Sequence, residues 1–259
     1  MKIKIVDFVH SDFYLLAQAE FIEKKKRRGE LLSHFPFLSD SNLFKNIIIE
    51  NDNGKVVAGL VLKLTHLCKV KFGSVGLVVV DESERGRGYS KIILDAAIDE
   101  AKQLNLDFML LWTSLHNVYN KAGFIVNEPL EYLQFQEKKQ NISVIEKVKG
   151  DFLSRPTYTQ RLGIFEYQNA EVTFVDDGQG FIFVDYSGDI KTAASIILEK
   201  YNRLTGPRVF LEKGDPLINE LKQRQTDYVC FDSAYEMRLI LNENNSREYN
   251  FHCKFLDRI

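Results

Sequence analysis

The chain has 259 residues, and its 45% hydrophobic and 27% charged residues are ordinary values for a globular protein. This composition excludes a disordered, collagen-like or fibrous chain, and the length predicts one large or two small domains. The formal net charge is -2, from 34 Lys and Arg against 36 Asp and Glu, and this balance argues against general nucleic-acid binding.

The first half of the chain predicts a mixed sheet with helices between its strands. Residues 2–8 alternate with a period of two, as a strand does, and a helix is expected at about 12–28. Two β-rich runs flank Asp52, Asn53 and Gly54, where the Asn-Gly pair is a strong hairpin signal because both residues tolerate positive φ. The next expected elements are strands at 72–80 and 108–113, a helix from Ser90, a short helix at 118–122 and a strand from Phe124.

The second half repeats this pattern in a shorter form. A second hairpin signal ends at Gly178, between runs at 170–175 and 181–185. In the first half 36 residues separate Gly54 from Ser90, whereas 11 separate Gly178 from Asp189, so a strand and its loop are expected to be missing. The remaining expected elements are helices at 190–203 and 216–225 and strands at 209–211, 228–231 and 237–241.

The sharpest local feature is a glycine-rich segment between the predicted strand at 72–80 and the following helix. It reads Arg85, Gly86, Arg87, Gly88, Tyr89 and Ser90. Two glycines allow a tight turn whose backbone N–H groups point one way at a helix N-terminus, which suits a phosphate or pyrophosphate. Arg85 and Arg87 add charges that pair with phosphate oxygens. An ordinary glycine turn with solvated arginines is the alternative.

Two other nucleotide motifs are excluded by spacing. A dinucleotide fingerprint would need glycine at position 91, where Lys91 stands, and it would follow the first strand of a parallel unit. The GxxxxGK[ST] pattern of a P-loop is absent from the sequence.

Residues 72–124 resemble the acetyl-CoA-binding core of the GNAT family of N-acetyltransferases. The family motif [RQ]-x-x-G-x-[GA] matches residues 85–90, with Ser90 in place of the usual Gly or Ala. A second family block, Tyr-x-x-x-Gly-Phe, matches Tyr119, Gly123 and Phe124, and one helix and one strand fill the 31 residues between Gly88 and Tyr119. The resemblance implies an α/β fold with a mixed sheet, complete over about residues 1–135 and only in outline over 150–259.

The resemblance also implies where the co-substrate acetyl-CoA binds. Its pantetheine arm would lie where the strand of Val78, Val79 and Val80 separates from the strand at 108–113, and Gly76 agrees with a bulge there. Backbone donors of the glycine-rich segment would hold the diphosphate, and a strand N–H would polarise the thioester carbonyl. The implied cofactor-binding residues are Val78, Val79, Val80, Arg85, Gly86, Arg87, Gly88, Tyr89, Ser90 and Tyr119.

Tyr119 is the candidate catalytic acid. A phenol with a pKa near ~10 is protonated at neutral pH and can donate to the leaving thiolate. The alternative is a Tyr that only packs through its ring. The sequence does not identify the general base, because the strand at 76–80 has no acid. Glu50, His66 and His116 are candidates, and direct loss of the amine proton to water is the alternative.

The resulting prediction is a catalytic GNAT domain at 1–138, a polar linker at 139–150 and a degenerate GNAT-like domain at 151–259, which lacks the RxxGxG pattern. The predicted reaction moves an acetyl group from acetyl-CoA to a primary amine of a small molecule or peptide, by direct attack. One alternative is a non-catalytic CoA-binding regulatory or scaffolding protein. Another is an aminoacyl transferase with paired domains that acts on charged tRNA, against which the slightly acidic balance argues.

The remaining expectations concern location and partners. The start of the chain lacks the apolar centre of a signal peptide, no apolar run reaches the ~20 residues of a membrane span, and three cysteines form no CxxC pair. We therefore expect a cytoplasmic protein without membrane or nucleic-acid partners. The five histidines lack ligand spacing, so no metal is expected. A homodimer is left open.

Overall fold

The computed structural model describes residues 1–67, 70–126, 130–135, 142–148, 159–178, 180–200, 208–224, 228–232 and 235–242. These residues form two compact units. The first unit holds residues 1–126 and 236–242, and the second holds residues 130–232. Each unit is built on a seven-stranded mixed sheet, which confirms the predicted α/β class.

The sheet of the first unit has the strand order β1-β2-β3-β4-β5-β14-β6. Strands β1 to β4 pair antiparallel, and β4 pairs parallel with β5, as the helix between them requires. The predicted hairpin at residues 52–54 connects β2 and β3, and Gly54 has a φ of +78°. The strands span Lys2–Val6 (β1), Phe44–Glu50 (β2), Val56–Leu67 (β3), Val70–Val80 (β4), Phe108–Thr113 (β5), Ile125–Val126 (β6) and Tyr235–Ile240 (β14).

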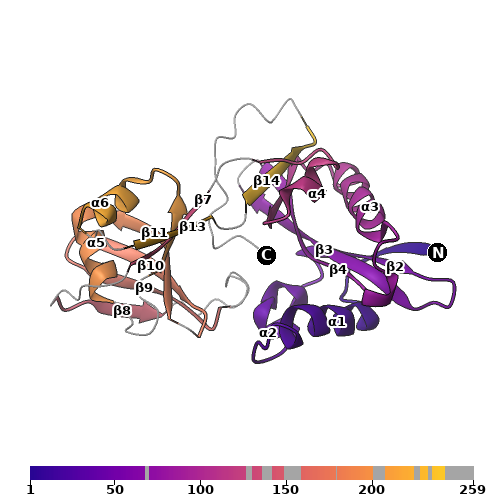
Figure 1. The fold of residues 1–259 in the computed structure, drawn as a ribbon, viewed down its shortest axis with the longest axis horizontal. Coiled ribbons are helices and arrows are strands. Elements are labelled where there is room, and N and C mark those ends of the chain that lie inside the picture. The colour runs from indigo at the N-terminus through magenta and orange to yellow at the C-terminus, as the bar shows by residue number, and fades with distance from the viewer. Residues whose placement is uncertain are drawn as a thin grey trace. The chain divides into compact units, whose positions relative to one another are not determined.

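Helices cover both faces of this sheet, with α1 and α2 on one face and α3 and α4 on the other (Figure 1). Helix α3 buries the apolar stripe that its sequence periodicity predicts, from Ile93 to Ala101. The helical elements of the unit are α1 (Ser11–Gln18), the π-helix η1 (Ala19–Glu23), α2 (Leu31–His34), the 3-10 helices η2 (Pro36–Ser39) and η3 (Glu82–Glu84), α3 (Tyr89–Gln103) and α4 (His116–Asn120).

The first helix is shorter than the predicted span of 12–28. Helix α1 passes into η1 at Ala19, where the backbone bonds widen to the i→i+5 pattern, as in the bond from Lys24 N to Ala19 O (3.0 Å). The basic residues from Lys24 to Arg28 therefore follow the helix and do not form its last turn. A uniform 3.6-residue period cannot predict this change of winding.

The second unit has the strand order β13-β7-β12-β11-β10-β9-β8, and its helices α5 and α6 lie on one face of this sheet (Figure 1). Its core stacks Phe165 on Phe174, with ring centroids 4.2 Å apart, under the apolar face of α5. The elements are β7 (Leu130–Phe135), β8 (Ile145–Val148), β9 (Arg161–Tyr167), β10 (Ala170–Asp176), β11 (Phe181–Gly188), α5 (Ile190–Glu199), β12 (Arg208–Glu212), α6 (Pro216–Arg224) and β13 (Tyr228–Asp232).

The prediction that the second unit lacks a strand is wrong. Its antiparallel strands β9, β10 and β11 and its parallel pair β11–β12 repeat β2, β3, β4 and β5 of the first unit. The turn at Gly178 therefore corresponds to the turn between β3 and β4, whereas the counterpart of Gly54 is the turn at Gln168, which also has positive φ (+51°). The strand is present, and what is absent between β11 and α5 is the loop.

The structure also places the domain boundaries differently from the predicted spans of 1–138, 139–150 and 151–259. Strand β7 lies within the first predicted span but pairs with β12 and β13 in the second sheet. Strand β14 lies within the last span but joins the first sheet beside β5, where Leu241 N donates to Asp107 O (3.0 Å). Relative to the predicted spans, the two strands are thus exchanged, β7 into the second unit and β14 into the first, and β8 occupies part of the predicted linker. Local polarity cannot reveal such pairing between distant segments.

Candidate functional site

Strands β4 and β5 separate halfway along their length. Within the described residues, their parallel pairing runs from Phe72 to Ser74 on β4 and ends there. Beyond this point β4 carries a bulge, because two of its residues, Leu77 and Val78, face the single residue Leu60 of β3. Leu77 has the unusual φ of +51°. The bulge therefore adjoins Gly76, the expected position, but a leucine adopts the strained conformation.

The backbone of β4 presents polar groups to the opening between β4 and β5. Asp81 N donates to Val57 O of β3 (2.8 Å), and Val79 lies opposite Gly59 in the same ladder. Because backbone groups alternate in direction along a strand, those of Val78 and Val80 point to the other side, into the opening. The carbonyl of Val80 accepts a hydrogen bond from Arg85 Nε (3.3 Å), as this direction requires.

The predicted glycine-rich turn connects β4 to α3. Gly86 and Gly88 have φ values of +82° and +80°, which a side chain would strain, while the space beside each is open. Gly88 is the residue before the helix, and Lys91 N and Ile92 N both donate to its carbonyl. The backbone N–H groups of residues 86–90 donate no hydrogen bond within the described part of the chain. They form a set of available donors at the positive end of the α3 dipole.

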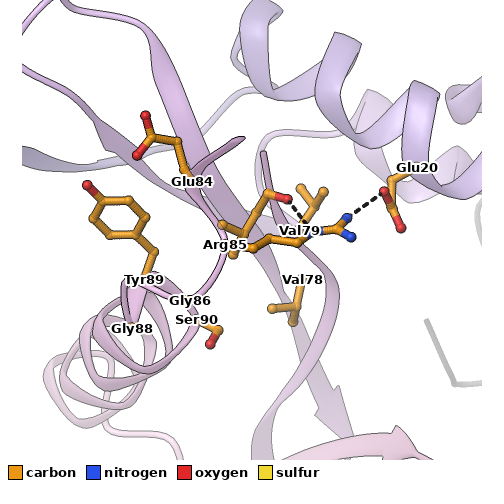
Figure 2. Close-up of a pocket in the computed structure, with 10 residues that line it drawn as sticks. Glu20, Val78, Val79, Glu84, Arg85, Gly86, Gly88, Tyr89 and Ser90 are labelled. Atoms are coloured by element: carbon orange, nitrogen blue, oxygen red, sulfur yellow. Dashed lines mark hydrogen bonds and ion pairs between the residues drawn. The ribbon is translucent and has the colours of Figure 1, made fainter. Parts of the chain in front are cut away.

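Eight of the ten predicted cofactor residues line one cavity of about 340 Å³, which we call the loop cavity. Arg87 is not among its lining residues and pairs with Glu84 (2.9 Å). Figure 2 shows the glycine-rich turn on one side of this cavity and Glu20, from η1, on the other. The loop cavity is lined by Glu20, Val78, Val79, Val80, Glu84, Arg85, Gly86, Gly88, Tyr89 and Ser90.

Glu20 and Glu84 are cavity residues that sequence reasoning missed. Glu20 accepts a hydrogen bond from Arg85 Nη2 (3.0 Å), and Lys24 donates to the same carboxylate (2.7 Å). The hydrogen bond from Lys24 and the charges of Lys24 and Arg85 hold the pKa of Glu20 below its usual range, against a smaller opposing effect of burial. The spacing of Glu20 and Lys24 is a visible i,i+4 signal, but the pairing with Arg85 spans 65 residues.

Tyr119 lies in a second, smaller cavity of about 170 Å³, which we call the Tyr119 cavity. Both cavities are lined by Val78 and Ser90, so they adjoin at the bulged part of β4. The ring of Tyr119 packs edge-on against Phe124 (centroids 6.3 Å apart), and Gly123, with a φ of +90°, turns the chain between them. Burial raises the pKa of Tyr119.

None of the three candidate bases lines either cavity. Glu50 forms an ion pair with Lys4, and neither His66, on β3, nor His116, on α4, lines either cavity. The described residues contain no group of three His, Cys, Asp or Glu arranged to hold a metal ion. None of the described helices is both long and apolar enough to cross a membrane.

Comparison with known proteins finds a family match within the first unit. The model of the acetyltransferase (GNAT) family matches residues 10–124, which carry both cavities. The search of curated proteins gave no match.

Three solved structures share the overall fold of the chain. A conserved protein of unknown function from Enterococcus faecalis has 11% identity and a TM-score of 0.63, covering 93% of this chain and 73% of that one. A GCN5-related N-acetyltransferase from Anabaena variabilis has 13% identity and a TM-score of 0.62, with the same coverage. A tandem GNAT protein from the clavulanic acid biosynthesis pathway has 9% identity and a TM-score of 0.62, covering 92% of this chain and 98% of that one.

Proposed function

Residues 10–124 match the model of the acetyltransferase (GNAT) family, and from this premise we propose that the chain transfers an acetyl group from acetyl-CoA to a primary amine. The family implies acyl transfer from an acyl-CoA. We further propose that the acyl group is acetyl and that the acceptor is a primary amine. The observation that carries it is the conjunction of the β4 bulge, the glycine-rich turn and Tyr119 around two adjoining cavities.

Backbone groups of the chain can bind both the diphosphate and the pantetheine arm of the co-substrate. The available N–H groups of residues 86–90 would hold the diphosphate, and Gly86 and Gly88 leave the approach to the backbone open. Ser90, in place of the family's Gly or Ala, also lines the cavity and adds only a hydroxyl. The pantetheine arm would lie along β4, where the backbone of Val78 and Val80 faces the opening.

The bulge supplies the polarising group for the reaction. An N–H group at Val78 or Val80, directed into the opening, can donate to the thioester oxygen as the attacking amine turns it into an oxyanion. The amine nitrogen forms the new bond to the carbonyl carbon, and the C–S bond then breaks to release the CoA thiolate. Val78 lines both cavities, so this step falls between the glycine-rich turn and Tyr119.

Tyr119 stabilises the leaving thiolate in this proposal. Since burial raises its pKa, the phenol stays protonated at neutral pH and is available as a hydrogen-bond donor. A raised pKa also makes complete proton transfer to a thiolate less favourable, because a free thiol is the stronger acid. We therefore assign Tyr119 a strong hydrogen bond to the developing thiolate, with the final proton supplied by solvent.

The amine loses its proton to water in this account. The carboxylates that line the loop cavity are Glu20 and Glu84, none lines the Tyr119 cavity, and each of the two is engaged in an ion pair with an arginine. The pKa of Glu20 is held below its usual range, chiefly by the hydrogen bond from Lys24, so its carboxylate is a weaker base for an ammonium group. The acceptor itself is a small-molecule or peptide amine, and we place the reaction in the cytoplasm, without nucleic-acid or membrane partners.

A non-catalytic CoA-binding protein is the second candidate. The ion pairs of both cavity carboxylates favour it, because they leave no obvious general base at the site. The two candidates make different predictions for the purified chain incubated with acetyl-CoA and a panel of small primary amines and peptides. Amine-dependent release of free thiol supports the enzyme, whereas binding of acetyl-CoA without thiol release on any amine supports the regulatory protein.

A further inference from the structure

Arg85 does not point at the glycine-rich turn to which it belongs. Its side chain extends across the loop cavity to the opposite wall, where it meets Glu20 of η1 (Figure 2). The guanidinium is held at two points there, by Glu20 Oε2 at 3.0 Å and by the Val80 carbonyl at 3.3 Å from Nε. Glu82 adds a second negative charge, 3.8 Å from Arg85 Nη1. The other arginine of the turn, Arg87, pairs with Glu84, the residue that directly precedes the turn.

This arrangement places Arg85 where the co-substrate is expected to bind. The Val80 carbonyl faces the opening between β4 and β5, so its bond to Arg85 uses a group that would otherwise pair with the pantetheine arm. The planar guanidinium fork also pairs closely with only a few anionic oxygens at a time. A diphosphate at the turn therefore competes with Glu20 for Arg85.

We propose that Glu20 is a positioning residue that holds Arg85 in this competing ion pair and thereby lowers the affinity of the site for acyl-CoA. The inference rests on the proposed function, because it assumes that the loop cavity takes the CoA diphosphate. When the diphosphate binds, Arg85 leaves Glu20 and the Val80 carbonyl and turns toward the phosphate oxygens.

The surroundings of Glu20 allow this exchange. Lys24 also donates to its carboxylate (2.7 Å), so Glu20 keeps one cation after Arg85 has left and is not stranded as an unpaired charge. Glu20 lies in the π-helix η1 and Lys24 directly follows it, and such segments are frequent at functional sites. Lys24 in turn also pairs with Glu82, which joins η1 to the segment that precedes the turn.

The test is calorimetric titration of CoA into four proteins: the full-length chain, Glu20→Gln, Arg85→Gln and the double variant. Glutamine is the family's alternative to arginine at position 85, which makes Arg85→Gln a conservative change. We expect Glu20→Gln to lower the Kd about two- to fivefold, the range for loss of a half-exposed ion pair. In the Arg85→Gln background the same substitution is expected to leave the Kd unchanged.

The double variant separates competition from simple repulsion. If Glu20→Gln lowers the Kd equally in both backgrounds, Glu20 only repels the diphosphate through space and the inference is overturned. It is also overturned if Glu20→Gln leaves the Kd of the chain unchanged. Glu50→Gln is the matched control, since it removes another lysine-paired carboxylate of the same unit outside both cavities, and it is expected to change nothing.

The same experiment distinguishes this inference from the proposed function. Absence of CoA binding by the unmodified chain would overturn both, whereas normal binding with no effect of Glu20→Gln would overturn only the inference. A second measurement does not depend on the folding of any variant. The Nε–H resonance of Arg85 in the unmodified chain is expected to shift more on addition of CoA than of pantetheine, which can take the Val80 carbonyl but lacks the diphosphate; equal shifts with both ligands would contradict the exchange.

Discussion

The two units differ in how a strand of the sheet is connected to the helix that follows it. In the first unit the eight residues 81–88 lead from β4 to α3 and leave the N–H groups of the turn available. In the second unit Asp189 alone separates β11 from α5, and its carboxylate accepts from Thr192 N (2.8 Å) and from the Thr192 hydroxyl (2.7 Å). One helix start is open to an anion, and the other is capped by the chain's own carboxylate.

The same contrast holds deeper in each unit. The first unit has a cavity between the β4 bulge and Tyr119. In the second, Tyr186 of β11 donates to Asp215, which precedes α6, and so ties the strand to the loop that leads into this helix (3.1 Å). The same order of strands and helices is therefore not sufficient for a cofactor site. A site needs a loop long enough to expose its amides and an opening that no side chain closes.

The largest expected effect comes from separating the units. Deletion of residues 145–259 removes β14, which lies between β5 and β6, and leaves β7 without its partners β12 and β13. We expect this truncated chain to lose cooperative unfolding, as measured by circular dichroism against temperature, because β5 loses its partner strand β14 and is left as an unpaired edge. A cooperative transition at the temperature of the full chain would show that the strand exchange is dispensable.

Tyr119→Phe should have the next largest effect. Loss of the hydroxyl is expected to reduce kcat at least tenfold while the Kd for acetyl-CoA changes less than twofold, since the phenol acts on the leaving thiolate. Steady-state kinetics together with calorimetry separate the two quantities.

Tyr186→Phe is the matched control in the second unit. Its hydroxyl serves a structural hydrogen bond, and burial, followed by the charge of Asp215, raises the pKa of Tyr186 to about 12. This variant should keep full turnover and lose about 2–5 °C of melting temperature. A reversal of the two results, with turnover lost only in Tyr186→Phe, would contradict the assignment of the sites.

Substitution by alanine should have different effects at Gly88 and Gly188, the glycines of the two connections. Gly88→Ala meets open space, so its strain, roughly 1–2 kcal/mol, comes from the positive φ and is relieved by turning the amides away from the cavity. We expect a roughly tenfold higher Kd for CoA and a small change in melting temperature. In Gly188→Ala the new Cβ would lie 1.9 Å from Asn169 O, so stability should fall by about 2–3 kcal/mol with CoA binding retained.

The smallest expected effect is a pH dependence at the start of the open loop. Hydrogen bonds from Lys55 and Ser83 lower the pKa of Asp81 from 3.8 to about 2. A lowered pKa in the folded state stabilises the protein fully above pH 3.8, and this contribution is lost as the pH falls toward 2. Asp81→Asn should therefore destabilise the chain at pH 7 and roughly a third as much at pH 2.5, where the carboxylate of the folded chain begins to take up its proton, as urea unfolding at both pH values would show. Equal destabilisation at both pH values would contradict this account.

Local spacing was enough to predict the parts of the site that lie close together in the chain. The glycine-rich turn and the block from Tyr119 to Phe124 depend on neighbouring residues, and the structure brings both to the β4 bulge. Helix α3 was predictable because a long amphipathic period is a strong signal.

The features that sequence reasoning missed depend on contacts between distant segments. Glu20 meets Arg85 only through the fold, and the positive φ falls on Leu77 because β3 offers one residue opposite two, a property of register. The exchange of β7 and β14 likewise depends on strand partners more than 70 residues away. The prediction that the second half lacks a strand was wrong for a related reason, since two hairpin turns look alike in sequence whichever strands they join.

The central claim is that the first unit alone takes acyl-CoA, through the amides of its glycine-rich turn. Its most direct test is the stoichiometry of CoA binding to the full-length chain, measured by calorimetry beside the Gly88→Ala variant. We predict one molecule bound per chain and weaker binding to the variant. Binding of two equivalent molecules, or binding that Gly88→Ala leaves unchanged, would contradict the claim.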